Sequence, residues 1–158
     1  MIREYKLYHG AVLADIVAMH QGPVTLRPEA EGGRLLNYVV NEVVGLQVKY
    51  ATQRLHPWHF NFSSSHISSL STLASTYPAC FVVLVCHTDG MIAIDAADVI
   101  ASLELNAEQM WLRADRKKHE MYRLHGPAGE FPGKFKTTAE PIVEALLRLE
   151  KVNERGRR

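Results

Sequence analysis

An apolar run from Cys80 to Cys86 constrains the fold of this chain more than any other stretch. The run reads CFVVLVC and contains no charged side chain. A strand that is apolar on both faces is typical of the interior of a sheet that has helices on each side. Asp89-Gly90 then predicts a tight turn into a second strand over Met91 to Ile94, so the two strands form a hairpin.

Helical signals stand before and after this run. Apolar residues recur at helical spacing over residues 5–20, and Gly22-Pro23 ends that pattern. Ser63 to Ser65 offer capping hydroxyls to a second helix that Pro78 ends, and Asp95 is an N-cap for a third. The third helix is predicted over residues 96–105, and Thr138 caps a last helix near the C-terminus.

A central hairpin precedes the apolar run. Residues 34–40 and 44–50 read as its strands, with a two-residue turn at Asn41-Glu42 and a third extended run that ends at Phe62. Such a turn would pair Asn37 with Leu46, Leu36 with Gln47, and Arg34 with Lys49. Because strand residues alternate between faces, Gln47 and Lys49 should point to one side of the sheet. Residues 24–27 read as a short strand and residues 28–33 as a loop.

Size and composition indicate one α/β domain over residues 1–153, followed by a disordered basic tail at 154–158. The formal charge of +1 over 158 residues implies no global attraction to polyanions, so any such site must be local. No run of apolar residues is long enough for a transmembrane helix, and the N-terminus does not resemble a secretory signal. Cys80 and Cys86 lie roughly 20 Å apart along one strand, beyond disulfide reach, so we expect free thiols in a reducing cytoplasm.

The order of these elements, helix, three strands, helix and strand, resembles the core of the restriction-endonuclease-like, or PD-(D/E)xK, nuclease superfamily. The chain also resembles a group of uncharacterised bacterial proteins through short motifs spread over most of its length. In this sequence those motifs are Leu7 to Gly10, Val48-Lys49, Pro57 to Phe60, Leu84 to Cys86 and Asp89-Gly90.

The nuclease resemblance implies a catalytic place on the central hairpin. In that superfamily an Asp on one strand, and an Asp or Glu two residues before a Lys on the next, hold Mg²⁺. The lysine position is Lys49 and the acid position is Gln47, so the resemblance implies a degenerate catalytic position. The partner strand offers no carboxylate. Three nearby glutamates remain as relocated acids: Glu29, Glu31 and Glu42.

Two basic segments are candidates for nucleic-acid contact. Arg54 follows the Lys49 strand and stands close to Trp58, for which a core position is favoured. A second predicted hairpin, residues 110–115 and 120–125, carries Arg113, Arg116 and Lys117. Mixed cations and aromatic rings suit phosphates and unstacked bases. The alternatives are a structural ion pair for Arg54 and a solvated hairpin edge for the second group.

We therefore expect a mixed sheet flanked by helices, with an extra C-terminal hairpin and helix. The leading hypothesis is a nucleic-acid-associated module with a degenerate catalytic position, in which Lys49, Arg54, Arg113, Arg116 and Lys117 contact DNA or RNA. One alternative is a Mg²⁺-dependent nuclease, a phosphodiesterase with a relocated acid, and Mg²⁺ is a cofactor only in that case. The other is an accessory protein that binds a protein partner. Association into a homo-oligomer stays open, and no membrane partner is expected.

Overall fold

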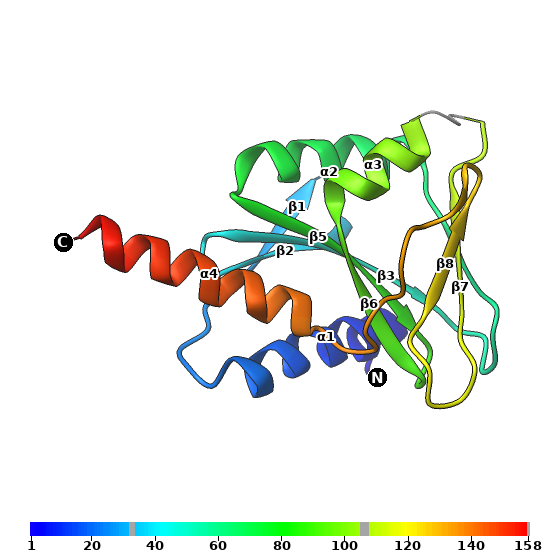
Figure 1. The fold of residues 1–158 in the computed structure, drawn as a ribbon, viewed down its shortest axis with the longest axis horizontal. Helices are drawn as coiled ribbons and strands as arrows, with labels where there is room; N and C mark the ends of the chain where they lie inside the picture. The colour runs from blue at the N-terminus through cyan, green and yellow to red at the C-terminus, as the bar shows by residue number, and fades with distance from the viewer. Residues whose placement is uncertain (32–33, 105–107, 158) are drawn as a thin grey trace.

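A computed structural model describes residues 1–31, 34–104 and 108–157, and it centres on a five-stranded mixed sheet (Figure 1). Its first three strands form an antiparallel group, the third pairs in parallel with the fourth, and the fifth is antiparallel to the fourth. In spatial order the strands are β1 (Leu26–Glu31), β2 (Arg34–Val40), β3 (Val44–Ala51), β5 (Ala79–Cys86) and β6 (Gly90–Asp95).

Helices cover both faces of this sheet, as expected. Helices α1 (Glu4–His20) and α4 (Glu140–Gly156) pack on one face, and α2 (Ser64–Thr76) and α3 (Ala96–Glu104) pack on the other. The domain boundary expected at residue 153 lies inside α4. None of the described helices combines the length and apolar character needed to cross a membrane.

Strand β5 confirms the prediction made from the apolar run. It lies between β3 and β6, and its residues from Cys80 onward are buried. Cys80 and Cys86 are free thiols in the core layer beneath α2 and α3, and burial raises the pKa of each to about 12. Neither thiol is therefore activated as a nucleophile.

A second sheet packs beside the first (Figure 1). The third extended run of the sequence, which ends at Phe62, lies in this sheet and not in the sheet of the central hairpin. It pairs instead with the predicted C-terminal hairpin, which forms as expected. In spatial order the strands are β4 (Trp58–Asn61), β7 (Trp111–Asp115), β8 (Arg123–Gly126) and β9 (Gly129–Glu130).

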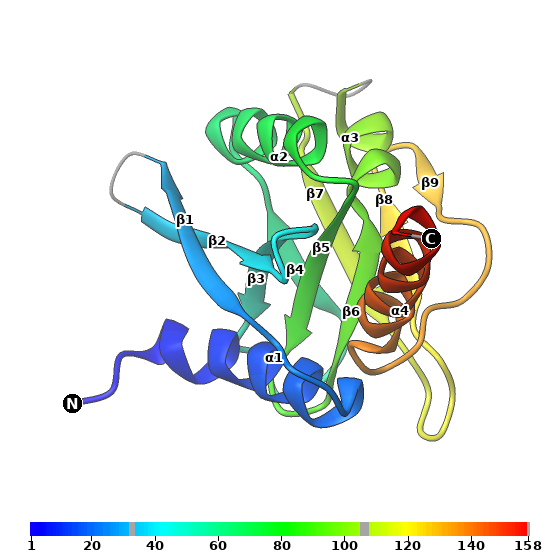
Figure 2. The same cartoon turned by 90° about the vertical axis from the view of Figure 1, so that its left-hand side faces the viewer.

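Strand β1 completes the antiparallel group with β2 and β3, although most of its residues were expected to form a loop. Of the predicted loop 28–33, residues 28–31 belong to β1, and residues 32–33 lie outside the described chain. Pro28 is compatible with the strand because β1 is at the edge of the sheet. Figure 2 shows β1 and β2 at that edge, between α1 and α2.

The register of the β2–β3 hairpin differs from the prediction by one residue. Asn41 and Glu42 form the turn with positive φ angles of 50° and 56°, and the Val43 N–H donates to the Val40 carbonyl. Val43 is then one extra residue before the ladder, which begins with Val40 opposite Val44. A shift of one residue reverses which side chains share a face. Asn37 therefore lies opposite Gln47 rather than Leu46.

Candidate functional site

Three polar side chains lie side by side across strands β1, β2 and β3. Glu29 on β1 is directly opposite Asn37 on β2, which is directly opposite Gln47 on β3. Directly opposed residues share a face of the sheet. This row, which we call the polar row, faces α2, since Asn37 and Gln47 both bond to that helix.

Helix α2 holds both amides of the polar row. The Asn37 side-chain N–H donates to Ser69 Oγ at 2.6 Å, and the Gln47 side-chain N–H donates to the His66 carbonyl at 3.0 Å. Gln47 is 1% exposed and Asn37 is 5% exposed. Asn37 Oδ1, Gln47 Oε1 and Glu29 Oε2 are buried, and none has a hydrogen-bond partner within the described part of the chain.

Glu29, which the sequence analysis placed in a loop, lies on strand β1. The Glu29 carboxylate also accepts a hydrogen bond from Tyr77, at the end of α2. Burial, together with this hydrogen bond, raises the pKa of Tyr77. An alternation of polar Arg27 and Glu29 with Leu26 and Pro28 was the signal for a strand here. Pro28 obscured this signal, because a proline argues against a strand unless the strand lies at the edge of a sheet.

Lys49 lies on the same face, two residues beyond Gln47, and its amine is engaged inside the protein. Its Nζ donates to the Asn61 carbonyl and to His66 Nδ1, the latter at 3.1 Å, and stands 4.4 Å from the centre of the Phe62 ring. Burial lowers the pKa of Lys49 to about 8. Lys49 on β3 therefore bonds to both β4 and α2.

His66 connects this lysine to the start of α2. The Ser63 side chain accepts from the His66 backbone N–H, and the Ser63 backbone N–H donates to His66 Nδ1, which together form a capping box. Since Nδ1 accepts from both Ser63 and Lys49, we assign the neutral tautomer with its proton on Nε2. The sequence indicated the serine cap but gave no sign of the lysine.

The side chains in the polar row do not fit the Mg²⁺ site that the nuclease resemblance implies. Mg²⁺ in protein sites is bound through one or two carboxylates. Gln47, the acid position that the resemblance implies, and its neighbour Asn37 are neutral amides, and the one carboxylate of the row, Glu29, is on the edge strand. Among the described residues, no three His, Cys, Asp or Glu side chains are grouped as metal ligands would be.

The other predicted cations gather away from Lys49. Trp58 at the start of β4 pairs with Ala114 near the end of β7, so the loop containing Arg54 and the turn containing Lys117 lie at the same end of the second sheet. Arg113 is on the outer face of β7 nearby. Trp58 itself is 2% exposed, as its predicted core position requires.

Arg116 lies at this end too, but it has a local partner. Its guanidinium donates to both carboxylate oxygens of Asp89, at 2.6 and 3.0 Å, and lies 5.3 Å from the centre of the Tyr122 ring. Burial alone would raise the pKa of Asp89, but hydrogen bonds from Arg116 and from the Tyr122 hydroxyl hold it below its usual value. The Arg116 side chain is 19% exposed. Sequence reasoning missed this pair because Asp89 is distant along the chain.

Comparison with known proteins leaves the family of this chain open. A scan against protein-family models finds no match, and neither does a search of curated proteins. Among solved structures, the chain is similar to Hjc, a Holliday junction resolvase from Archaeoglobus fulgidus, an archaeal hyperthermophile. The similarity covers 79% of this chain and 88% of that one, with 12% identity and a TM-score of 0.37. A likeness at this level does not extend to an activity.

Proposed function

We propose that this protein is a nucleic-acid-associated module on a nuclease-like fold whose catalytic position is degenerate. The observation that carries the proposal is that the polar side chains near Lys49 bond to other parts of the protein. Gln47, at the implied acid position, and Asn37 beside it are buried amides that bond to α2, and Lys49 bonds to Asn61 and His66. A hydrolytic site must keep such groups available to substrate and metal. Here they stabilise the contact between the sheet and α2.

The proposed phosphate contacts are Arg54, Arg113 and Lys117. Arg54 and Lys117 lie at one end of the second sheet and Arg113 lies on its outer face, and none of the three makes an ion pair with another described residue. Since the net charge is only +1, nucleic acid would be attracted by this local group rather than by the whole molecule. We assign Lys49 and Arg116, which the sequence also suggested, to structural roles because of their internal partners.

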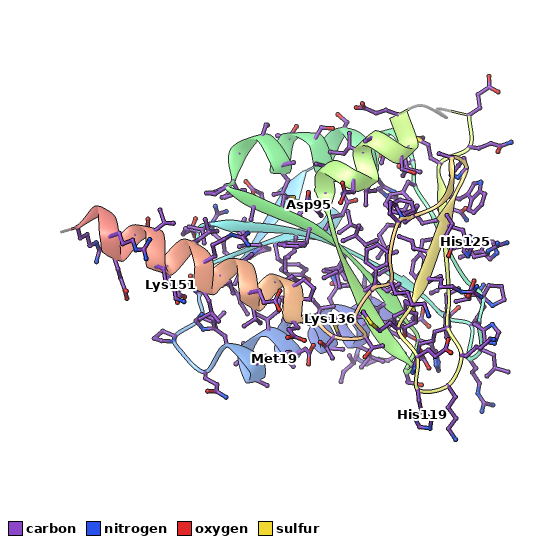
Figure 3. The ribbon with its side chains drawn as sticks, viewed as in Figure 1. Met19, Asp95, His119, His125, Lys136 and Lys151 are labelled. Carbon is purple, nitrogen blue, oxygen red and sulfur yellow. The ribbon has the colours of Figure 1, made fainter. Side chains whose placement is uncertain are left out.

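Fluorescence anisotropy with labelled oligonucleotides over a salt series tests this function. Three phosphate contacts give a log-log slope near −2.7 on duplex DNA, so fourfold more salt should weaken binding about 40-fold. Lys117→Ala and Arg54→Ala should each flatten the slope by about one unit. Lys151→Ala is the matched control, because Figure 3 places Lys151 on α4, at the opposite end of the molecule from His119 and His125.

Two outcomes would contradict the proposal. Folded protein that binds neither single-stranded nor duplex oligonucleotides at low salt would leave the protein-binding accessory role as the better explanation. Binding that Lys151→Ala weakens as much as Lys117→Ala would mean that a diffuse charge effect, rather than this site, carries the affinity.

The nuclease alternative rests on Glu29. This carboxylate occupies the polar row and keeps one buried oxygen without a hydrogen-bond partner among the described residues. If it replaces the missing acid, Mg²⁺ or Mn²⁺ should support cleavage of plasmid, single-stranded DNA or RNA. Glu29→Gln and Lys49→Met should then each abolish cleavage while circular dichroism reports a folded protein. We expect no metal-dependent cleavage, because one carboxylate and two amides bind Mg²⁺ weakly.

A further inference from the structure

The second sheet has one face that no described helix covers. Along β4, Trp58 and Phe60 are buried while His59 and Asn61 are exposed, and β7 and β8 show the same alternation. The buried side chains of this sheet join the core beneath α3. An antiparallel sheet commonly has one face on the core and one in water. Figure 3 shows His125 on the outward side of this sheet.

The residues on this outer face are aromatic and basic. His59, Arg113 and His125 form one row across β4, β7 and β8, in direct register. Trp111 lies two residues before Arg113 on β7, and its ring centre is 6.3 Å from that of His59. Trp111 is partly exposed in spite of its large apolar ring. Such a tryptophan on an open face is a candidate contact surface for a partner.

One carboxylate on this face, Asp115, already has partners. Asp115 accepts from Arg123 at 2.9 Å and lies 3.3 Å from His125 Nε2, so this carboxylate has its partners within the sheet. Arg113 makes no ion pair with any other described residue. The face therefore offers one available guanidinium between two imidazoles and beside an indole. The end of the same sheet carries Arg54 and Lys117.

We propose that the outer face of β4, β7 and β8 binds single-stranded nucleic acid, with unstacked bases on Trp111 and His59 and the backbone on Arg113. This inference rests on the proposed function and narrows it to a strand form and a surface. Duplex nucleic acid keeps its bases stacked inside, so a flat aromatic face gains little from it. Base stacking on aromatic rings combined with a cationic backbone track is the general chemistry of single-strand binding.

Trp111 supplies a test that does not depend on activity. The chain has two tryptophans, and Trp58 is 2% exposed in the core. In a Trp58→Phe protein shown to be folded, Trp111 is the sole indole, and stacked bases should quench its emission. We expect quenching by oligo-dT or oligo-U and weak quenching by a duplex of equal length. Comparing oligo-dT with oligo-U separates DNA from RNA as the source of the strand.

Affinities complete the test. Trp111→Ala should weaken single-strand binding by roughly 5- to 150-fold, while Trp111→Phe should keep most of it because a ring remains. Unchanged affinity in Trp111→Ala, or a preference for duplex, would overturn this inference. If Lys117→Ala still flattened the salt slope in that case, the proposed function would survive. A dimer in sedimentation velocity that Trp111→Ala dissociates would instead assign the face to a second copy of the chain.

Discussion

Lys49 Nζ donates a hydrogen bond to His66 Nδ1 at 3.1 Å, and the same ring nitrogen accepts from the Ser63 backbone N–H. Lys49, the lysine to which the nuclease resemblance pointed, thus contacts the N-terminal cap of α2. The contact links an interior strand to the helix that covers it. These contacts account for a partly buried lysine without invoking a substrate.

The cap can be tested by changing His66. His66→Ala removes the acceptor for the Ser63 N–H and for Lys49, and should lower the free energy of unfolding by about 1–2 kcal/mol. His66→Gln should cost less, since glutamine at this position completes an ordinary capping box. Urea unfolding at pH 7 measures both. Equal losses for the two variants would mean that the cap does not depend on an acceptor at residue 66.

The lowered pKa of Lys49 makes a prediction about pH. Its folded pKa of about 8 is below the ordinary value of 10.5, so the unfolded chain holds the proton more strongly. Below pH 8 the buried charge lowers the free energy of unfolding by its full amount. This destabilisation decreases as the pH rises from 8 toward 10.5, because the folded protein loses the proton first. The stability of the native protein relative to Lys49→Met should rise over that range in chemical denaturation. A difference that stays flat would show that the amine is not buried as a cation.

Gln47→Glu would restore the acid of the nuclease pattern. The change removes the N–H that donates to the His66 carbonyl and puts a carboxylate at a site that is 1% exposed. We expect a loss of about 1–3 kcal/mol at pH 7. Burial raises the pKa of such a carboxyl, so the loss should shrink toward pH 5. Thermal unfolding with and without excess Mn²⁺ shows whether a carboxylate at residue 47 holds a metal, because a bound metal would recover the lost stability.

Arg116 and Lys117 are neighbours in sequence with different expected roles. Arg116→Gln removes the ion pair with Asp89 and leaves that partly buried carboxylate with the Tyr122 hydroxyl alone, so we expect a loss of about 1–3 kcal/mol. Lys117→Gln should change stability by less than about 0.5 kcal/mol. A double-mutant cycle with Asp89→Asn measures the coupling. Additive effects of Arg116→Gln and Asp89→Asn would contradict a structural pair.

Much of the architecture followed from local sequence. The apolar run over Cys80 to Cys86 specified an interior strand, because side chains on both faces had to leave water. Helical periodicity and the Ser63 cap located α1 and α2, since hydrogen bonds within a helix are local. The alternation of Gln47 and Lys49 with their apolar neighbours was likewise correct, because it depends only on the pleat of a strand.

The tertiary structure alone decided which polar residues meet. One extra residue, Val43, shifted the hairpin register and brought Asn37 opposite Gln47, and a local pattern does not specify such a shift. The same holds for Glu29 on its edge strand, for His66 beside Lys49, and for Asp89 beside Arg116. These contacts join residues that are distant in the chain, and only the packing of the sheets and α2 makes them neighbours. The sequence thus determined the layers of this protein, and long-range packing determined that the amides of Asn37 and Gln47 lie side by side and bond to α2.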